Sequence, residues 1–331
     1  MKNSFRNEFR TYNKYSTEYL SSCQKHSIAN KKAICKYFPQ LGVLIHSISS
    51  NCNFLRMARL KALFSKKFPI IGMIHVDPLP GTPLYSNQFE DTIKKAKHEA
   101  EIYVKGKIDA ILIENMHDLP YVQSKFLGPE TVACMSRIAV AVKEVIHNIL
   151  PCGIQILACG NKEALAIAKA CDLDFIRTEG FVFSHVADEG VTNADAGHIL
   201  RYRKHIDAQH VGIITDIKKK HSSHAITNDV SLCETAKAAE FFLSDGLVLT
   251  GKATGYETDI DDIKSLKGKV NLPLILGSGV TMDNIDRYWK VADAAIVGSF
   301  FKTHGTWQNN VDEERVRSFM NKIVRLRKGI L

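Results

Sequence analysis

Two short apolar runs near the end of the chain, each followed at once by glycine and serine, constrain the fold most. The first, Leu274–Leu276, leads into Gly277, Ser278 and Gly279, and the second, Ala294–Val297, leads into Gly298 and Ser299. A segment of helical character, 282–290, separates them. Glycines let backbone N–H groups approach an anion closely. In barrels of eight βα units, the loops after the last two strands commonly bind phosphate. The alternative is that these glycines form tight turns only, but two such turns at repeat spacing favour a phosphate site.

From Phe68 onward, apolar segments of strand length alternate with amphipathic segments of helix length. This alternation is typical of a parallel sheet with crossover helices. Strands are expected at residues 70–76, 109–113, 154–158, 175–177, 211–215, 246–250, 274–276 and 294–297. An open doubly wound sheet would show the same pattern. The count of eight strands and the paired glycines favour an α/β fold of the (β/α)8 TIM-barrel type over residues 68–331.

One helix shows how the sequence specifies these elements. Pro129 suits the first position of a helix, and Glu130 follows in the positively polarised first turn. An apolar stripe of helical period follows, formed by Val132, Met135, Ile138, Val142, Val145 and Ile149. We expect this stripe to lie against the barrel wall.

The positive charge of the chain is concentrated in its first 67 residues. They hold 13 of the 44 Lys and Arg but 2 of the 35 Asp and Glu, which leaves 31 basic against 33 acidic side chains beyond. The barrel is therefore near neutral, which argues against a nucleic-acid partner. A basic, acid-poor leader is typical of a mitochondrial transit segment. The alternative is a disordered tail or a translation start at Met57, which would give a cytoplasmic protein.

Two further features restrict the class of protein. The eight cysteines are scattered singly, which indicates reduced thiols in the cytosol or an organelle rather than a disulfide framework. No stretch reaches the roughly 18 apolar residues that a membrane span needs. The sequence does not determine whether the chain forms a homo-oligomer.

Polar side chains gather where the expected strands end, the face that carries the active site in such barrels. They are His75 and Asp77 at the end of the first strand, Glu114 at the end of the second, Glu179 at the end of the fourth, and Asp216, Lys218 and His221 at and beyond the end of the fifth. Clustered carboxylates raise one another's pKa and suit acid and base catalysis. The same set could hold a divalent cation through oxygen ligands and an imidazole. Alternatively, each carboxylate caps a helix or pairs with a neighbouring cation.

Three loops beyond these strands carry further polar residues. Residues 179–193 include His185, Asp188 and Glu189, and residues 216–229 include Lys218, Lys219, Lys220, His221 and His224. A lysine run is ordinarily solvated, but beyond an active-face strand it could neutralise a phosphate. The third loop, residues 250–259, contains Thr250, Gly251, Thr254 and Gly255, which could enclose a ribose or a phosphate.

Long motifs cover most of residues 68–305. They are IIGMIHVDPLPGTP (70–83), LIENMHDLP (112–120), PETVACMSRIA (129–139), RTEGFVFSHVADEG (177–190), DIKKKHSSH (216–224), VLTGKATG (248–255) and LGSGVTMDNI (276–285). In these motifs the chain resembles the BtpA/SgcQ family of TIM-barrel proteins, named for a factor in photosystem I biogenesis. The resemblance implies a (β/α)8 barrel and does not fix a reaction. The segment LACGNKEA (157–164) departs from the more polar ending common in that family, so a ligand contact by Asn161 is not implied.

Two hypotheses of function follow. The first is an enzyme acting on a phosphorylated small molecule, a sugar phosphate or nucleotide, by hydrolase, lyase or isomerase chemistry. The glycines and serines at 277–279 and 298–299, with Thr250 and Gly251, would bind the phosphate, while His75 and the carboxylates transfer protons. The second is an assembly or stabilising factor for a protein complex, as the family's name suggests. Flavin mononucleotide also suits such a phosphate site.

Overall fold

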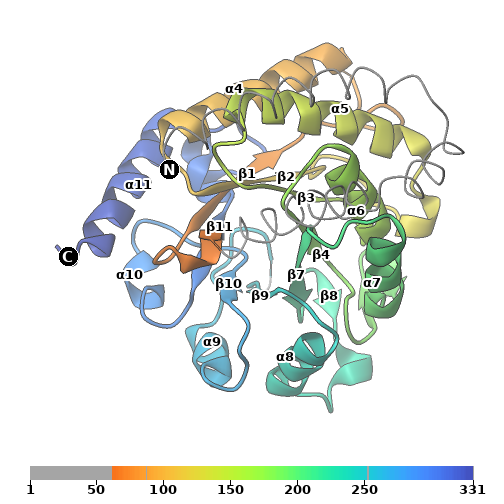
Figure 1. Ribbon diagram of the computed structural model, residues 1–331, viewed down its shortest axis with the longest axis vertical. Coiled ribbons are helices and arrows are strands. Elements are labelled where there is room, and N and C mark those ends of the chain that lie inside the picture. Colours follow the sequence, from red (N-terminus) through yellow and green to blue (C-terminus); the bar gives the residue numbers. More distant parts are fainter. Residues whose placement is uncertain (1–61, 87, 252, 331) are drawn as a thin grey trace, which may run out of the picture. The chain divides into compact units, whose positions relative to one another are not determined.

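The computed structural model describes residues 62–86, 88–251 and 253–330. In it, eight parallel strands close into a barrel in the order β1-β11-β10-β9-β7-β4-β3-β2 (Figure 1). They are β1 (Ile70–His75), β2 (Ala110–Glu114), β3 (Cys152–Gln155), β4 (Phe175–Thr178), β7 (Gly212–Ile217), β9 (Gly246–Leu249), β10 (Leu274–Leu276) and β11 (Ala294–Val297). The (β/α)8 barrel predicted from the sequence is confirmed.

Helices surround the barrel and connect its strands (Figure 1). They are α4 (Phe89–Lys105), α5 (Pro129–Ile146), α6 (Asn161–Ala170), α7 (Ala196–His205), α8 (Leu232–Phe241), α9 (Ile260–Leu266), α10 (Ile285–Tyr288) and α11 (Glu313–Arg327). Short 3-10 helices lie at η1 (Ser124–Phe126), η2 (Ala225–Thr227), η3 (Ser299–Phe301) and η4 (Thr303–Gly305). Within the described residues, no helix combines the length and apolar character needed to cross a bilayer.

The barrel interior is filled by side chains that alternate along the strands. Ile71 and Met73 of β1 point inward with Leu112, Phe175 and their counterparts on the other strands, forming a core separate from that beneath the helices. Phe175 lies where a Cβ on Gly153 would come 2.4 Å from its ring, so β3 needs glycine there. The helical turn at 62–65 contributes the buried Leu63 to the same interior core.

Four aspartates connect neighbouring strands at their amino-terminal ends. Each stands directly before a strand, and its carboxylate accepts an N–H from the start of the preceding barrel strand. The pairs are Asp109 with Ile70 (2.9 Å), Asp174 with Cys152 (2.9 Å), Asp245 with Ile213 (2.8 Å) and Asp293 with Leu274 (2.8 Å). In each pair the aspartate N–H donates back to the partner's carbonyl. The barrel is therefore built from four similar two-strand units.

Some boundaries differ from the sequence prediction. The third strand occupies Cys152–Gln155 rather than 154–158, and the fifth extends to Ile217. The helix expected over 282–290 is a single turn, Ile285–Tyr288. Helix α5 ends at Ile146 because His147 adopts a left-handed conformation (φ 45°), so Ile149 lies beyond the helix and is exposed. The apolar stripe predicted for this helix is thus wrong at its last member.

The two long loops predicted after the fourth and fifth strands pair with each other. The first forms a hairpin of β5 (His185–Ala187) and β6 (Gly190–Thr192), and the second contributes β8 (Ser222–Ser223). These strands make a small sheet in the order β6-β5-β8. Both loops are thereby fixed over the carboxyl-terminal end of the barrel.

Candidate functional site

The interior of the barrel becomes polar at the carboxyl ends of its strands. His75 follows Met73 on the inward face of β1, Glu114 follows Leu112 on β2, and Arg177 follows Phe175 on β4. Register places Glu114 beside both His75 and Gln155 in the neighbouring strands. The regular alternation of the strands therefore turns sequence-distant polar residues toward one space.

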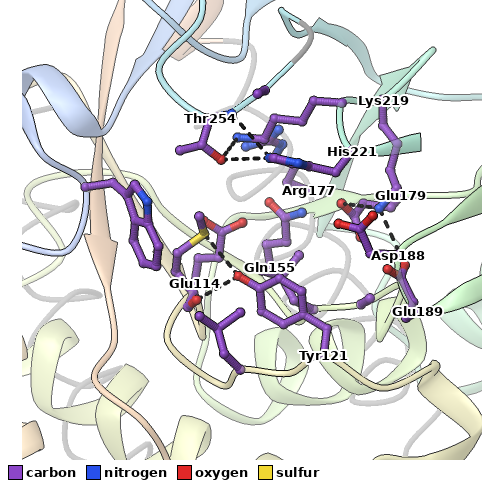
Figure 2. A pocket seen from close by; sticks show the side chains of 17 residues that line it. Glu114, Tyr121, Gln155, Arg177, Glu179, Asp188, Glu189, Lys219, His221 and Thr254 are labelled. Carbon is purple, nitrogen blue, oxygen red and sulfur yellow. Dashed lines mark hydrogen bonds and ion pairs between the residues drawn. The ribbon is translucent and has the colours of Figure 1, made fainter. Parts of the chain in front are cut away.

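That space is a cavity of about 360 Å³ (Figure 2). Its size suits a small metabolite. Most of its charged and polar lining comes from the strand ends and from the two paired loops: Glu114, Tyr121, Gln155, Arg177, Glu179, Asp188, Glu189, Lys219, Lys220, His221 and Thr254. Met116, Leu119, Leu157 and Trp307 supply an apolar part of the wall.

A smaller recess of about 30 Å³ adjoins the cavity. Its wall contains every residue of the two glycine-serine turns singled out in the sequence, 277–279 and 298–299, together with Gly255 and His75. Glu114, Met116, Arg177, Lys220 and Thr254 line both the recess and the cavity. The two spaces therefore meet at these side chains.

Close backbone approach requires glycine at Gly279 of the recess and at the nearby Gly251. Gly279 has φ +69°, and a Cβ there would lie 2.3 Å from the Tyr256 carbonyl oxygen. A Cβ on Gly251 would lie 2.4 Å from the same oxygen. The Ser278 hydroxyl donates to this carbonyl and accepts the Gly251 N–H, so it ties the two loops together. Ser278 thus shapes the recess through protein contacts.

Two buried ion-pair groups set the charge of the site. Arg177 donates two hydrogen bonds of 2.8 Å to the two carboxylate oxygens of Asp216. The Lys219 ammonium lies 3.3 Å from Glu179 and 3.5 Å from Glu189. Figure 2 shows Lys219 and Arg177 among the carboxylates. Cations therefore alternate with the acids that line this end of the barrel.

The expectation that the carboxylates raise one another's pKa applies to Glu114, where Glu179 and Asp216 act in that direction, and not to Glu179. Burial raises the pKa of Glu179, but Lys219 and then Arg177 outweigh it, so the net shift is downward. For Glu114, burial raises the pKa and prevails over the opposing effects of Arg177 and Lys220. Of these two carboxyls, Glu114 is thus the one that more readily holds a proton.

His75 faces Glu114 at 3.8 Å between Nε2 and Oε2. Its Nδ1 lies 3.2 Å from the Trp307 carbonyl oxygen, which fixes the ring. Burial, followed by the charge of Lys302, lowers the pKa of His75 well below its ordinary value. A neutral imidazole beside a carboxyl that favours its protonated form can transfer protons to or from a bound molecule.

The three consecutive lysines have three different surroundings. Lys218 has a left-handed backbone (φ 50°), and its Nζ donates to the carbonyls of Thr227 and Val230, at 3.2 and 2.8 Å. Lys219 forms the ion pairs with Glu179 and Glu189 described above. The Lys220 Nζ donates to the Thr254 hydroxyl at 3.1 Å and faces both the cavity and the recess.

Other predicted residues are placed as follows. Asp77 pairs with Lys95 of α4 and belongs neither to the cavity wall nor to that of the recess. Thr250 accepts the Lys220 N–H at 3.0 Å, and His221 Nε2 accepts the Thr254 N–H at 3.2 Å at the edge of the cavity. Among the described residues, no group of three or more His, Cys, Asp or Glu side chains is arranged to hold a metal ion.

Several lining residues were not selected from the sequence. Gln155 is 2% exposed, and its Oε1 has no hydrogen-bond partner although it lines the cavity. Tyr121 and Trp307 follow no motif that indicates a site. Arg177 stands at the end of a strand within a quoted motif, which was the available signal, whereas Lys220 belongs to the lysine run that the sequence offered as a phosphate contact.

Comparisons with known proteins agree with this fold. A sequence model described as the BtpA family matches residues 66–325. An uncharacterized mitochondrial protein of Caenorhabditis elegans is 42% identical over 276 residues, covering 82% of this chain and 99% of that protein. Photosystem I biogenesis protein BtpA of Synechocystis is 30% identical over 258 residues, covering 78% of this chain and 88% of that protein. The crystal structure of KGPDC from Streptococcus mutans superposes with a TM-score of 0.51 at 10% identity, covering 78% of this chain and 99% of that one.

Proposed function

The chain belongs to the BtpA family, and on that premise we propose that it is an enzyme acting on a phosphorylated small molecule. The phosphate group of a sugar phosphate or nucleotide binds in the glycine-walled recess, and the reacting part lies in the adjoining cavity. The observation that carries this proposal is the junction of the two spaces at Glu114, Arg177 and Lys220.

The recess suits a phosphate for two reasons. Its glycines let backbone groups approach closely, and Arg177 and Lys220 bring positive charge to its edge. Glu114, which lines both spaces, and His75, which lines the recess, supply a proton-transferring pair 3.8 Å apart. Such a pair supports hydrolysis, elimination or isomerisation, since each of these moves protons at the substrate.

Gly255 offers a sharp test of the phosphate site. It lines the recess with φ +82°, and a Cβ there would meet only the Ser299 hydroxyl, at 3.8 Å. Asn and Asp both tolerate left-handed backbone and have nearly equal size. Gly255→Asn and Gly255→Asp therefore form a matched pair that differs in charge.

The measurement is thermal stabilisation by a panel of sugar phosphates and nucleotides. We expect a compound that stabilises the wild type to bind Gly255→Asp about tenfold or more weakly than Gly255→Asn, because the added carboxylate repels the phosphate. The proposal fails if no phosphorylated compound stabilises the wild type, or if the two variants respond alike.

A second candidate function is that of a non-catalytic assembly factor. It is favoured by the name of the 30% identical Synechocystis relative and by the exposed apolar side chains of Phe241 and Leu243 at the end of α8. If the chain is an assembly factor, we expect the Gly255→Asp variant to keep its partner complex and the Phe241→Ser variant to lose it. Loss of the partner in Gly255→Asp but not in Phe241→Ser would favour the enzyme.

For cellular location, we propose import into mitochondria, as in the name of the C. elegans relative. The basic leader that motivates this is residues 1–67, of which residues 1–61 lie outside the described residues. Amino-terminal sequencing of the protein from fractionated cells tests it. A cytosolic protein that begins at Met57 would contradict the proposal.

A further inference from the structure

Lys220 differs from the neighbouring lysines in what surrounds its amine. Among the described residues, no carboxylate lies within 4.0 Å of its Nζ, whereas Lys219 lies within that distance of two. The partner that holds the Lys220 amine is a neutral hydroxyl, that of Thr254. Its amine is therefore positioned without being neutralised by an ion pair.

The location of Lys220 is as specific as its contacts. It lines the recess and the cavity together, so a molecule with its phosphate in the recess would extend its carbon chain past this amine. The backbone is also fixed, because the Lys220 N–H donates to Thr250 and the adjacent β8 pairs with the β5 strand.

From this geometry we propose that Lys220 is a catalytic nucleophile that forms a Schiff base with the carbonyl carbon of a phosphorylated ketone or aldehyde. The inference rests on the proposed function and narrows its substrate class to carbonyl compounds. It also narrows the chemistry, because an iminium withdraws electrons from the neighbouring carbon and so assists C–H or C–C bond cleavage there.

The electrostatic surroundings support a reactive amine. Burial lowers the pKa of Lys220, and the nearby Arg177 charge lowers it further, which outweighs the pull of Glu114 and the other carboxylates. A lower pKa enlarges the fraction of neutral amine, the form that attacks a carbonyl.

The step balances with groups already present. The neutral Lys220 amine forms a C–N bond to the carbonyl carbon, and the former N–H proton passes to the carbonyl oxygen to give a carbinolamine. Glu114, whose raised pKa favours its protonated form, then donates a proton to that hydroxyl. The C–O bond breaks, water leaves, and the product is a protonated imine beside the Glu114 carboxylate. No oxidant or reductant is consumed.

The competing role for Lys220 is to bind phosphate as an ammonium ion without covalent chemistry. Lys220→Arg distinguishes the two roles, because a guanidinium keeps the positive charge but does not form an imine with the substrate.

The experiment incubates the full chain with dihydroxyacetone phosphate and sodium cyanoborohydride, which reduces the iminium to a stable amine. Intact mass and peptide mapping then locate the adduct. We expect labelling at Lys220 in the wild type, at least about tenfold above that of the exposed Lys264. Dihydroxyacetone without phosphate is expected to label Lys220 far less.

Thermal stabilisation by dihydroxyacetone phosphate is measured in parallel, so that the two proposals can fail separately. Stabilisation of the wild type and of Lys220→Arg, with labelling of the wild type alone, supports the Schiff base. Stabilisation of the wild type without an adduct at Lys220 overturns the Schiff base and leaves the phosphate site intact. If dihydroxyacetone phosphate gives no stabilisation and no adduct, the result counts against both the phosphate site and the Schiff base. Labelling of Lys220 that is no greater than labelling of Lys264 overturns the Schiff base.

Discussion

Arg177 and Asp216 form a bidentate ion pair between neighbouring strands β4 and β7, with side chains that are only 4% and 2% exposed. The pair lies at the carboxyl end of the barrel interior, directly under the cavity. Burial opposes the charge of Arg177, but Asp216 outweighs it and raises the arginine pKa above its ordinary value. Each partner therefore makes the other's burial tolerable.

Removing one member of this pair should be costly. We expect Asp216→Asn to lower the free energy of unfolding by about 3–5 kcal/mol, because it removes the hydrogen-bonded counter-charge of the buried Arg177. Urea denaturation measures the change. Glu257→Gln is the control, since its ion pair with Arg287 is about half exposed and should contribute less than about 1 kcal/mol. Equal effects of the two substitutions would contradict this account.

Gln155 should matter for ligand binding rather than for folding. The buried Oε1 of Gln155 has no protein partner, and a buried polar atom without a partner destabilises the folded state. Gln155→Met removes this atom, so we expect the free energy of unfolding to stay the same or to rise. If a ligand donates a hydrogen bond to this oxygen, the same variant weakens binding by about tenfold, or about 1.4 kcal/mol. Urea denaturation and calorimetric titration test the two parts. Lower stability with unchanged affinity would reverse the interpretation.

Stability should rise with pH on the acidic side of neutrality. Burial lowers the pKa of His117 and of His185 to about 4, from an ordinary value of 6.5. Between these values the unfolded chain binds protons that the folded protein does not, so stability is lost as the pH falls from 6.5 toward 4. Each group adds at most about 1.4 kcal/mol per pH unit to the slope.

Unfolding curves at several pH values check this dependence. His185→Gln should flatten the slope, because it removes one of the imidazoles whose pKa is lowered in the folded protein. His98→Gln, which replaces an exposed imidazole, is the control for the substitution itself. A slope that His185→Gln does not reduce would show that His185 is not its source.

The aspartates before the strands should stabilise the barrel individually. Asp174 is 1% exposed, and Asp174→Ala removes the acceptor of the Cys152 N–H. We expect a loss of about 1–3 kcal/mol, the usual cost of leaving a buried backbone donor without its partner. Asp283→Ala, on an exposed turn, should change stability by less than about 0.5 kcal/mol. Thermal or urea unfolding distinguishes the two.

The architecture was predictable because it depends on patterns that repeat along the chain. The seventh and eighth strands lie at the predicted residues, since a glycine marks the end of each. The third strand was misplaced because its actual residues, Cys152–Gln155, include a glycine, whereas the more apolar Ile156 and Leu157 belong to the turn that follows. Glycine is needed at position 153 because the ring of Phe175, on the next strand, lies against it. A local sequence pattern does not reveal such a contact between strands.

The site was predictable only at the level of which segments meet. Strand ends in a barrel converge, so the acids and the glycine turns were assigned to one face. Which lysines of the run 218–220 face the cavity depends on the left-handed turns at Lys218 and His221, and composition does not specify these turns. The alternation of cations with acids likewise depends on which side chains touch, as for Lys219 between Glu179 and Glu189.

The aspartate repeat also indicates where new chain termini can be introduced by circular permutation. Joining the ends of the described segment and cutting within α5, between the units of Asp109 and Asp174, would keep each aspartate in the same stretch of polypeptide as its partner strand. Cutting within α4 would separate Ile70 from Asp109 along the chain. Circular permutants of the first kind should tolerate their new termini better, which makes the two-strand unit the natural module for recombining this barrel with its relatives.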